Sequence, residues 1–223
     1  MGYNVAIDGP AGAGKSTIAK MIAKDLEFIY VDTGAMYRAM ALFYIEQGVN
    51  KDDAQAVSSK CSDADITIVY ENKEQQVYLN GKNVNGLIRT EEVGNMASCI
   101  SVNKNVRQKL VELQQKMAAT ADVIMDGRDI GTCVLPNADV KIYLTAGSRV
   151  RALRRYNELK AKGVECNLDE IERDIIERDE RDMNRDISPL RKADDAILVD
   201  SSDMSIEEVV SAIKEIINKD RES

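Results

Sequence analysis

Residues 9–16 of this 223-residue chain read GPAGAGKS and match the pattern G-x-x-x-x-G-K-[S/T]. Glycines let such a loop turn its backbone amides inward around an oxyanion, and the positive end of a following helix adds to the attraction. Lys15 would reach the β- and γ-phosphates of a nucleotide, and the Ser16 hydroxyl, rather than the neighbouring Thr17, would hold Mg²⁺. We predict an ATP-type nucleotide site made of Gly9, Pro10, Ala11, Gly12, Ala13, Gly14, Lys15, Ser16 and Thr17.

Two further polar segments follow apolar runs. The stretch VDTGAMYR follows one run and supplies Thr33, Tyr37 and Arg38. The guanidinium of Arg38 would fork onto a phosphate, unless it is a surface group on an ordinary helix. The ends of parallel strands build ligand sites, so we expect these side chains at one edge of a sheet.

The stretch IMDGRDIG comes directly after another apolar run and carries Asp126, Arg128 and Asp129. Asp126 takes the position where many phosphate-loop enzymes keep a carboxylate near Mg²⁺. Arg128 would hold the phosphate of an acceptor. The alternative is a solvated turn with no ligand.

An apolar stripe with helical spacing begins at Leu168 and becomes charged partway along residues 168–186. This change indicates a helix that leaves the core and overhangs a polar cleft, although a helix laced by Arg–Glu pairs is the alternative. Such a cluster suits the charge that spreads over a transferring phosphoryl group. The charged members of the stripe are Arg178, Asp182 and Arg185, with Arg181 beside them.

Composition limits the chemistry. The chain has no histidine, which excludes histidine-based acid–base catalysis and histidine-ligated metals, and its net charge of −8 argues against nucleic acid as a partner. Four widely spaced cysteines indicate reduced thiols and no zinc site. No apolar run is long enough to cross a membrane, and the first residues do not have the pattern of a signal sequence. We therefore expect a cytoplasmic protein, and a monomer by default.

Apolar runs that alternate with helical patterns predict an α/β protein with a parallel sheet covered on both faces. We expect strands at 3–8, 28–32, 122–129, 139–145 and 196–202. Residues 65–84 alternate instead and contain Asn80-Gly81, which predicts a small antiparallel sheet with a type I′ hairpin. Helices are expected at 14–25, 35–48, 90–101 and 103–119. Residues 148–186 should form a helix–loop–helix that is broken near Gly163. A last helix is expected at 205–219, where Ser205 and Glu208 form a capping box.

The receiver of the phosphate is open on these grounds alone. A kinase for a small acceptor, a GTPase that uses water, and a motor or nucleic-acid remodeller all carry such a loop. A GTPase needs N-K-x-D after a strand, and Asn72-Lys73, Asn103-Lys104 and Asn218-Lys219 all lack the aspartate at the right place. A phosphate acceptor is already ionised near neutral pH, with a second pKa of about 6, so a chain without histidine suits it.

Five segments resemble bacterial cytidylate kinases, which are phosphate-loop nucleoside-monophosphate kinases. They are IDGPAGAGKST, DTGAMYRAMA, DGRDIGTCVLPNADVKIYL, ERDERDMNRDISPL and DSSDMSIEEVV, and the resemblance spans residues 3–217. It implies a three-layer P-loop NTPase fold with a five-stranded parallel sheet and one kinase domain over 1–223. That domain would have a core at 1–62, 120–147 and 187–223, a monophosphate-binding insert at 63–119 and a lid at 148–186.

The resemblance also implies roles. Lys15 would hold ATP, Arg38 and Arg128 would bind the phosphate of CMP or dCMP, and Arg178 and Arg185 would bridge the two substrates from the lid. Asp182 would accept a hydrogen bond from the ribose. Ser98, Arg107 and Asp129 would read the base, with cytosine donating to Asp129 and accepting from Arg107, a pattern that uracil reverses. A kinase for UMP and a non-catalytic nucleotide-binding regulator are the alternatives.

Overall fold

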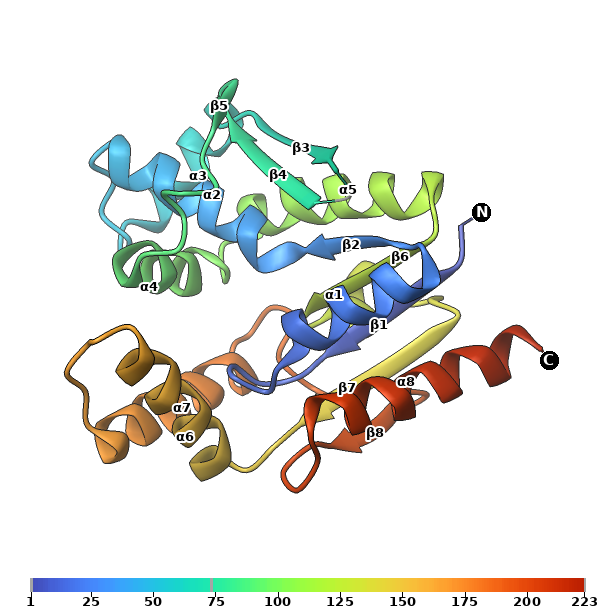
Figure 1. Ribbon diagram of the computed structural model, residues 1–223. Coiled ribbons are helices and arrows are strands. Elements are labelled where there is room, and N and C mark those ends of the chain that lie inside the picture. The colour runs from blue at the N-terminus through green and yellow to red at the C-terminus, as the bar shows by residue number, and fades with distance from the viewer. Residues whose placement is uncertain (1, 73, 223) are drawn as a thin grey trace.

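The computed structural model describes residues 2–72 and 74–222. A five-stranded parallel sheet forms its centre, in the order β2-β6-β1-β7-β8 (Figure 1). This confirms the predicted fold class. The strands are β1 (Asn4–Asp8), β2 (Ile29–Asp32), β6 (Val123–Gly127), β7 (Val140–Thr145) and β8 (Ile197–Asp200).

Helices cover both faces of the sheet because each central strand is apolar on both sides. On β1, Val5 and Ile7 pack into one cluster with the buried sides of α1 (Lys15–Leu26) and α8 (Ile206–Arg221). Ala6 faces the other cluster, which α2 (Thr33–Glu46) and α5 (Lys104–Thr120) cover. The predicted capping box of Ser205 and Glu208 is present at the start of α8.

Two short elements that the sequence analysis did not predict follow α2, namely α3 (Ala54–Lys60) and the 3₁₀ turn Cys61–Asp63. A separate antiparallel sheet follows, formed by β3 (Ile66–Glu71), β4 (Glu74–Leu79) and β5 (Lys82–Asn83). Asn80 and Gly81 both have positive φ, as a type I′ turn requires, so that prediction is confirmed. The helix α4 (Glu91–Ile100) then leads into α5, and β4 and α4 both contact α2.

Two antiparallel helices, α6 (Ser148–Ala161) and α7 (Leu168–Met183), make up the segment that was expected to be a lid, and we keep that name for it. The break between them falls at Gly163 as predicted, with φ +72°. The predicted helix over 168–186 is too long, because α7 ends at Met183 and Arg185 follows the helix. The lid and α4 lie at the same end of the central sheet, while both chain termini lie at the opposite end (Figure 1).

The buried apolar side of α1 is formed by Ile18, Ala19, Ile22 and Ala23, whereas Met21 is 37% exposed. Among the residues that the structure describes, no helix is both long and apolar enough to cross a membrane.

Candidate active site

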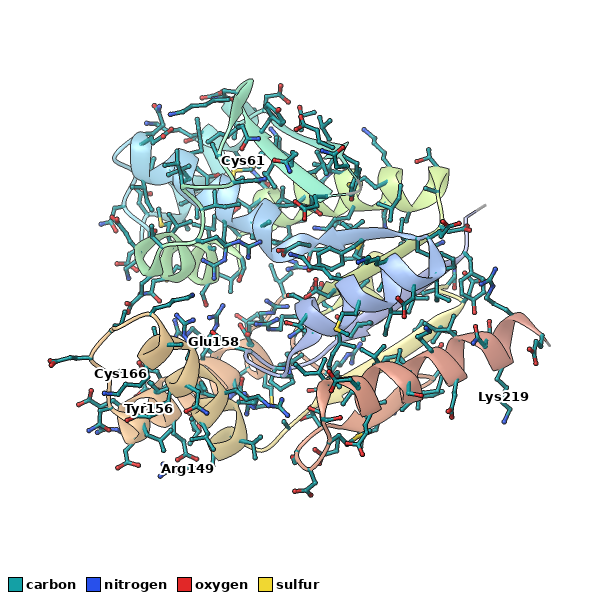
Figure 2. All side chains as sticks on the ribbon, in the orientation of Figure 1. Cys61, Arg149, Tyr156, Glu158, Cys166 and Lys219 are labelled. Atoms are coloured by element: carbon teal, nitrogen blue, oxygen red, sulfur yellow. The ribbon has the colours of Figure 1, made fainter. Side chains whose placement is uncertain are left out.

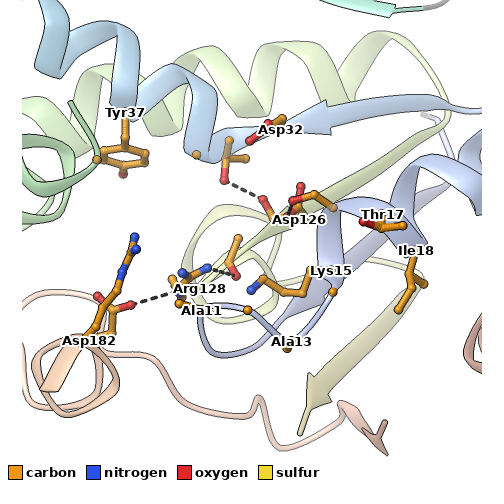
Figure 3. A pocket seen from close by; sticks show the side chains of 18 of the residues that line it. Ala11, Ala13, Lys15, Thr17, Ile18, Asp32, Tyr37, Asp126, Arg128 and Asp182 are labelled. Atoms are coloured by element: carbon orange, nitrogen blue, oxygen red, sulfur yellow. Dashed lines mark hydrogen bonds and ion pairs between the residues drawn. The ribbon is translucent and has the colours of Figure 1, made fainter. Parts of the chain in front are cut away.

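A cavity of about 710 Å³ opens where the carboxyl ends of β1, β2 and β6 meet the insert and the lid (Figure 3). Its lining includes most of the predicted residues. These are Ala11, Gly12, Ala13, Gly14, Lys15, Ser16, Thr17, Thr33, Tyr37, Arg38, Ser98, Arg107, Asp126, Arg128, Asp129, Arg178, Asp182 and Arg185. Gly9 and Pro10 do not line the cavity; their carbonyls accept hydrogen bonds from Lys15.

The phosphate loop depends on its glycines at two places. Gly14 caps α1 at φ +90°, a left-handed conformation that L side chains rarely adopt. A Cβ at Gly9 would lie 1.9 Å from the Leu144 carbonyl oxygen, so the loop passes β7 too closely for any side chain. The loop therefore wraps around the start of α1, whose free amides and positive end face the cavity.

Lys15 is buried beneath this loop. Its Nζ donates to the carbonyl oxygens of Gly9 and Pro10, each at 2.8 Å. Burial, together with the positive charge of Arg128, lowers the pKa of Lys15 to about 7, although Asp126 and Asp8 attract the ammonium form. A polyanion in the loop would favour the charged form.

Asp126 is held in the centre of the site. Tyr30 donates its hydroxyl to Oδ1 at 2.7 Å, Ser16 donates to Oδ2 at 2.9 Å, and Thr33 donates to the backbone oxygen at 2.7 Å. Burial and the negative charge of nearby Asp32 raise the pKa of the Asp126 carboxyl. The carboxylate thus keeps the Ser16 hydroxyl oriented at the mouth of the phosphate loop.

On the other side of the cavity, ion pairs join the lid to the core. Arg128 donates from Nε to Asp182 of α7 at 2.9 Å (Figure 3). Asp129 lies between two arginines: Arg107 of α5 donates to its Oδ2, and Arg185 approaches its Oδ1 at 3.6 Å. Arg185 also donates to the backbone oxygen of Ser188 at 2.5 Å.

Arg38 extends from α2 across the start of α4. Its Nη1 makes long contacts to the carbonyl oxygens of Ile88, at 3.3 Å, and Thr90, at 3.4 Å. A Cβ at Gly94 would come within 2.9 Å of this guanidinium, so the missing side chain there makes room for Arg38. Burial and the positive charge of Arg89 lower the pKa of Arg38.

Several buried polar atoms of the cavity lining have no hydrogen-bond partner within the protein. They are the hydroxyl oxygens of Tyr37 and Ser98, Nε of Arg178 and Nη2 of Arg185. Burial, with Arg128 nearby, lowers the pKa of Arg178 to about 10. Buried polar groups normally have hydrogen-bond partners, and neighbouring arginines repel one another unless an anion lies between them. The arrangement therefore favours a polar, anionic ligand.

Comparison with known proteins agrees with these features. The family model described as Cytidylate kinase matches residues 5–219. The chain belongs to the cytidylate kinase family. It is 48% identical over 215 residues to a cytidylate kinase of Carboxydothermus hydrogenoformans, covering 96% of this chain and 97% of that protein. A cytidylate kinase of Lactobacillus johnsonii is 51% identical over 215 residues, with 96% and 94% covered.

Among solved structures, an uncharacterised protein from Eubacterium ventriosum matches 97% of this chain and 98% of its own with a TM-score of 0.51. The two sequences are 12% identical, so this likeness concerns the fold alone. Membership of the cytidylate kinase family confirms the resemblance found in the sequence motifs and removes the GTPase and motor alternatives.

Cavity-lining residues that the sequence analysis did not assign include two arginines and one aspartate. Arg89 pairs with Asp32 at 2.5 Å, and Arg154 donates to the backbone oxygen of Ser201 at 2.7 Å. Asp32 was visible in the DTGAMYR motif, whereas no local pattern marks Arg89. Arg181 lies near Arg178 as expected, but it is exposed and does not line the cavity with Arg178 and Arg185.

Proposed function

We propose that this member of the cytidylate kinase family transfers the γ-phosphoryl group of ATP to CMP or dCMP, giving ADP and CDP or dCDP. The observation that carries the proposal is the cluster of partnerless polar atoms and arginines opposite the phosphate loop. A GTPase or a regulator that binds only a triphosphate has no need of this second half of the cavity. A second anionic ligand would satisfy it.

We assign the donor to the phosphate loop, residues 9–17. Its amides and the positive end of α1 cradle the phosphates of ATP, and Lys15 exchanges the carbonyls of Gly9 and Pro10 for β- and γ-phosphate oxygens. This exchange returns Lys15 to a negatively charged environment, which restores the ammonium form that burial disfavours.

Mg²⁺ fits the residues at the mouth of the loop. The Ser16 hydroxyl donates a hydrogen bond to Asp126, so the lone pairs of its oxygen remain available to a metal ion. Among the residues that the structure describes, no cluster of three or more acidic, Cys or His side chains forms a metal cage, which suits an ion held mainly by phosphates and water. When bound, Mg²⁺ would neutralise charge on the β- and γ-phosphates. Ser16 would hold it, and Asp126 would orient Ser16.

We assign the acceptor phosphate to Arg38 and Arg128, both of which line the cavity. Arg128 pairs with Asp182, and the phosphate of the acceptor would take the place of Asp182 in this pair. Arg128 then takes the phosphate, and Asp182 accepts a hydrogen bond from the ribose. Thr33 and Tyr37 lie beside this position, and the partnerless Tyr37 hydroxyl is available to the same ligand.

Transfer requires no general base, because the acceptor phosphate is ionised near neutral pH. Catalysis is then a matter of aligning two phosphates and stabilising the charge that spreads between them. We assign Lys15, Arg128, Arg178 and Arg185 to this role, with Arg178 and Arg185 supplied by the lid. Closure of the lid also excludes water, which otherwise competes as the acceptor.

We assign recognition of the base to Ser98, Arg107 and Asp129. Cytosine donates from its N4 amino group and accepts at N3 and O2, so it complements a carboxylate beside a guanidinium. Uracil places a carbonyl against Asp129 and an N–H against Arg107. Because these side chains are buried, the mismatch leaves polar groups unpaired and costs much of the activity.

We also propose that the enzyme works as a monomer in the cytoplasm. All four cysteines are free thiols, as is usual in a reducing compartment.

The test is release of ADP from ATP and Mg²⁺ with a panel of acceptors: CMP, dCMP, UMP, AMP, TMP and water alone. We expect fast turnover with CMP and dCMP and little with the others. Fast turnover with UMP or AMP instead would contradict the assignment of the base-reading residues. ADP release without any acceptor would contradict the assignment of the whole acceptor half.

A further inference from the structure

Arg151 is buried between the phosphate loop and the lid, and the roles assigned above do not use it. It lies on α6 and is only 5% exposed. Its Nε donates to the Ala146 carbonyl oxygen at 2.8 Å, at the end of β7, and Nη1 donates to the Ala11 carbonyl oxygen at 2.9 Å. Its Nη2 pairs with Asp179 of α7 at 2.6 Å. One guanidinium therefore joins three separate parts of the fold.

The contact with the phosphate loop involves packing as well as a hydrogen bond. Gly12 has φ +76°, and a Cβ there would lie 3.3 Å from the Cβ of Arg151. The base of the Arg151 side chain thus packs against the loop at Gly12, while its guanidinium holds the carbonyl of the preceding residue. Displacement of the loop would therefore move the Arg151 side chain.

The contact with the lid lies next to groups that the reaction uses. Asp179 follows Arg178 directly, and Asp182 lies one turn further along α7. Asp179 is 7% exposed, and its second oxygen, Oδ1, has no hydrogen-bond partner. A buried carboxylate that forms an ion pair with one arginine depends strongly on that arginine for its position.

We propose that Arg151 is a positioning residue that couples the lid helix α7 to the phosphate loop, so that Arg178 is aligned when ATP occupies the loop. This rests on the proposed function, since the alignment concerns transfer from ATP. The physical reason is rigidity: a bidentate or forked guanidinium with fixed partners transmits a small displacement, and phosphoryl transfer is sensitive to misplacement of about 1 Å.

A second pair of contacts between α6 and α7 provides a matched control. Arg149 pairs with Asp169 at 2.6 Å and Glu172 at 2.8 Å, but Arg149 and Asp169 are both exposed. Arg149 lies at the outer edge of the lid, away from the phosphate loop (Figure 2). If any salt bridge between the two helices sufficed, the Arg149 pair would matter as much as the Arg151 pair.

The first experiment compares Asp179→Asn with Asp169→Asn. We expect Asp179→Asn to lower kcat with the accepted nucleoside monophosphate by about tenfold or more, with the KM for ATP changed less than threefold, because Arg151 still holds the loop. Asp169→Asn should leave both constants within twofold of the parent. Equal kcat for the two variants, or a loss that follows only the fraction of folded protein, would overturn the proposal.

A second readout needs no acceptor. Hydrogen exchange of α7 is measured with and without a non-hydrolysable ATP analogue and Mg²⁺. We expect the analogue to slow exchange in α7 in the parent and in Asp169→Asn, and to do so much less in Asp179→Asn and in Arg151→Lys, which loses the fork. An undiminished response in both test variants would overturn the coupling. Failure to phosphorylate CMP would instead contradict the proposed function and leave this result to be judged separately.

Discussion

The two halves of the cavity are built in different ways. The donor side is formed by consecutive residues of one loop, and the Lys15 ammonium donates hydrogen bonds to carbonyls of the same loop. The acceptor side draws on α2, α4, α5, the end of β6 and the lid, and it holds most of its polar groups in ion pairs or without partners. A loop that satisfies itself is preorganised, whereas an assembly of separate elements can depend on its ligand for order.

This contrast has a consequence for selectivity. Damage to the donor half should slow transfer to every acceptor by the same factor, because it does not touch the acceptor. Damage to the acceptor half should change the preference between bases and leave the affinity for ATP largely intact. The predictions below test that separation.

The largest effect is expected for Lys15→Met. The change removes the only charged side chain of residues 9–17 while keeping an apolar stem in the buried space. We expect kcat/KM to fall by about 10³-fold, in line with the loss of a preorganised charged donor. Measured with CMP and UMP in parallel, the ratio of the two rates should stay within threefold. A large change in that ratio would contradict the separation of the two halves.

A smaller but selective effect is expected for Asp129→Asn. The amide still accepts one hydrogen bond but also presents an N–H, which suits the carbonyl of uracil. We expect kcat/KM for CMP to fall by about 10²-fold and the preference for CMP over UMP to collapse, while the KM for ATP changes little. Since the change leaves Arg107 and Arg185 without their shared carboxylate, folding is checked by thermal unfolding. An unchanged preference would remove Asp129 from base recognition.

The same contrast explains how much the sequence could predict. The strands of the parallel sheet, the type I′ turn at Asn80-Gly81 and the Ser205 capping box were predicted correctly because a local pattern of residues marks each of them. Arg38 and Asp129 were marked by the motifs that follow two predicted strands. Arg107, and the role of Asp129 in reading the base, came only from resemblance to a family, since no local rule indicates that these distant segments meet.

The features that were missed are tertiary. The pair between Arg89 and Asp32 and the contacts of Arg151 with Ala11 and Asp179 join separate elements of the chain. The end of α7 at Met183 was also missed, because the charged spacing continues to Arg185 although the helix does not. The π-helical turn at residues 130–134 has a cause that only the fold reveals, namely a carboxylate on β1 that captures two of its amides.

That carboxylate belongs to Asp8 and gives a prediction of intermediate size. It accepts from the backbone N–H groups of Ile130 at 2.8 Å and Gly131 at 2.7 Å, directly after Asp129. In Asp8→Asn, one amide would meet the new NH₂ group, so the turn would shift. We expect the KM for CMP to rise about tenfold and the KM for ATP to change less than threefold.

Asp139→Asn is a fitting control for Asp8→Asn. Asp139 also accepts a backbone N–H of β1, that of Asn4 at 2.6 Å, but at the opposite end of the strand. It should change neither KM. If both variants raised the KM for CMP equally, general weakening of the sheet would explain the result and Asp8 would have no part in placing Asp129.

The smallest expected effect is the uptake of a proton when ATP binds. Burial lowers the pKa of Lys15 to about 7, so at pH 8 most of the ligand-free enzyme carries a neutral amine. A triphosphate in the loop raises that pKa, and binding must therefore take up a fraction of a proton at pH 8. Calorimetry of a non-hydrolysable ATP analogue in two buffers of different ionisation enthalpy measures it, and Lys15→Met should show none. CMP should take up much less of a proton, because its phosphate contacts arginines rather than Lys15, and these arginines stay charged at this pH, Arg178 included with its pKa of about 10. Equal uptake with both ligands would show that the two halves share one titrating group and are not separately built.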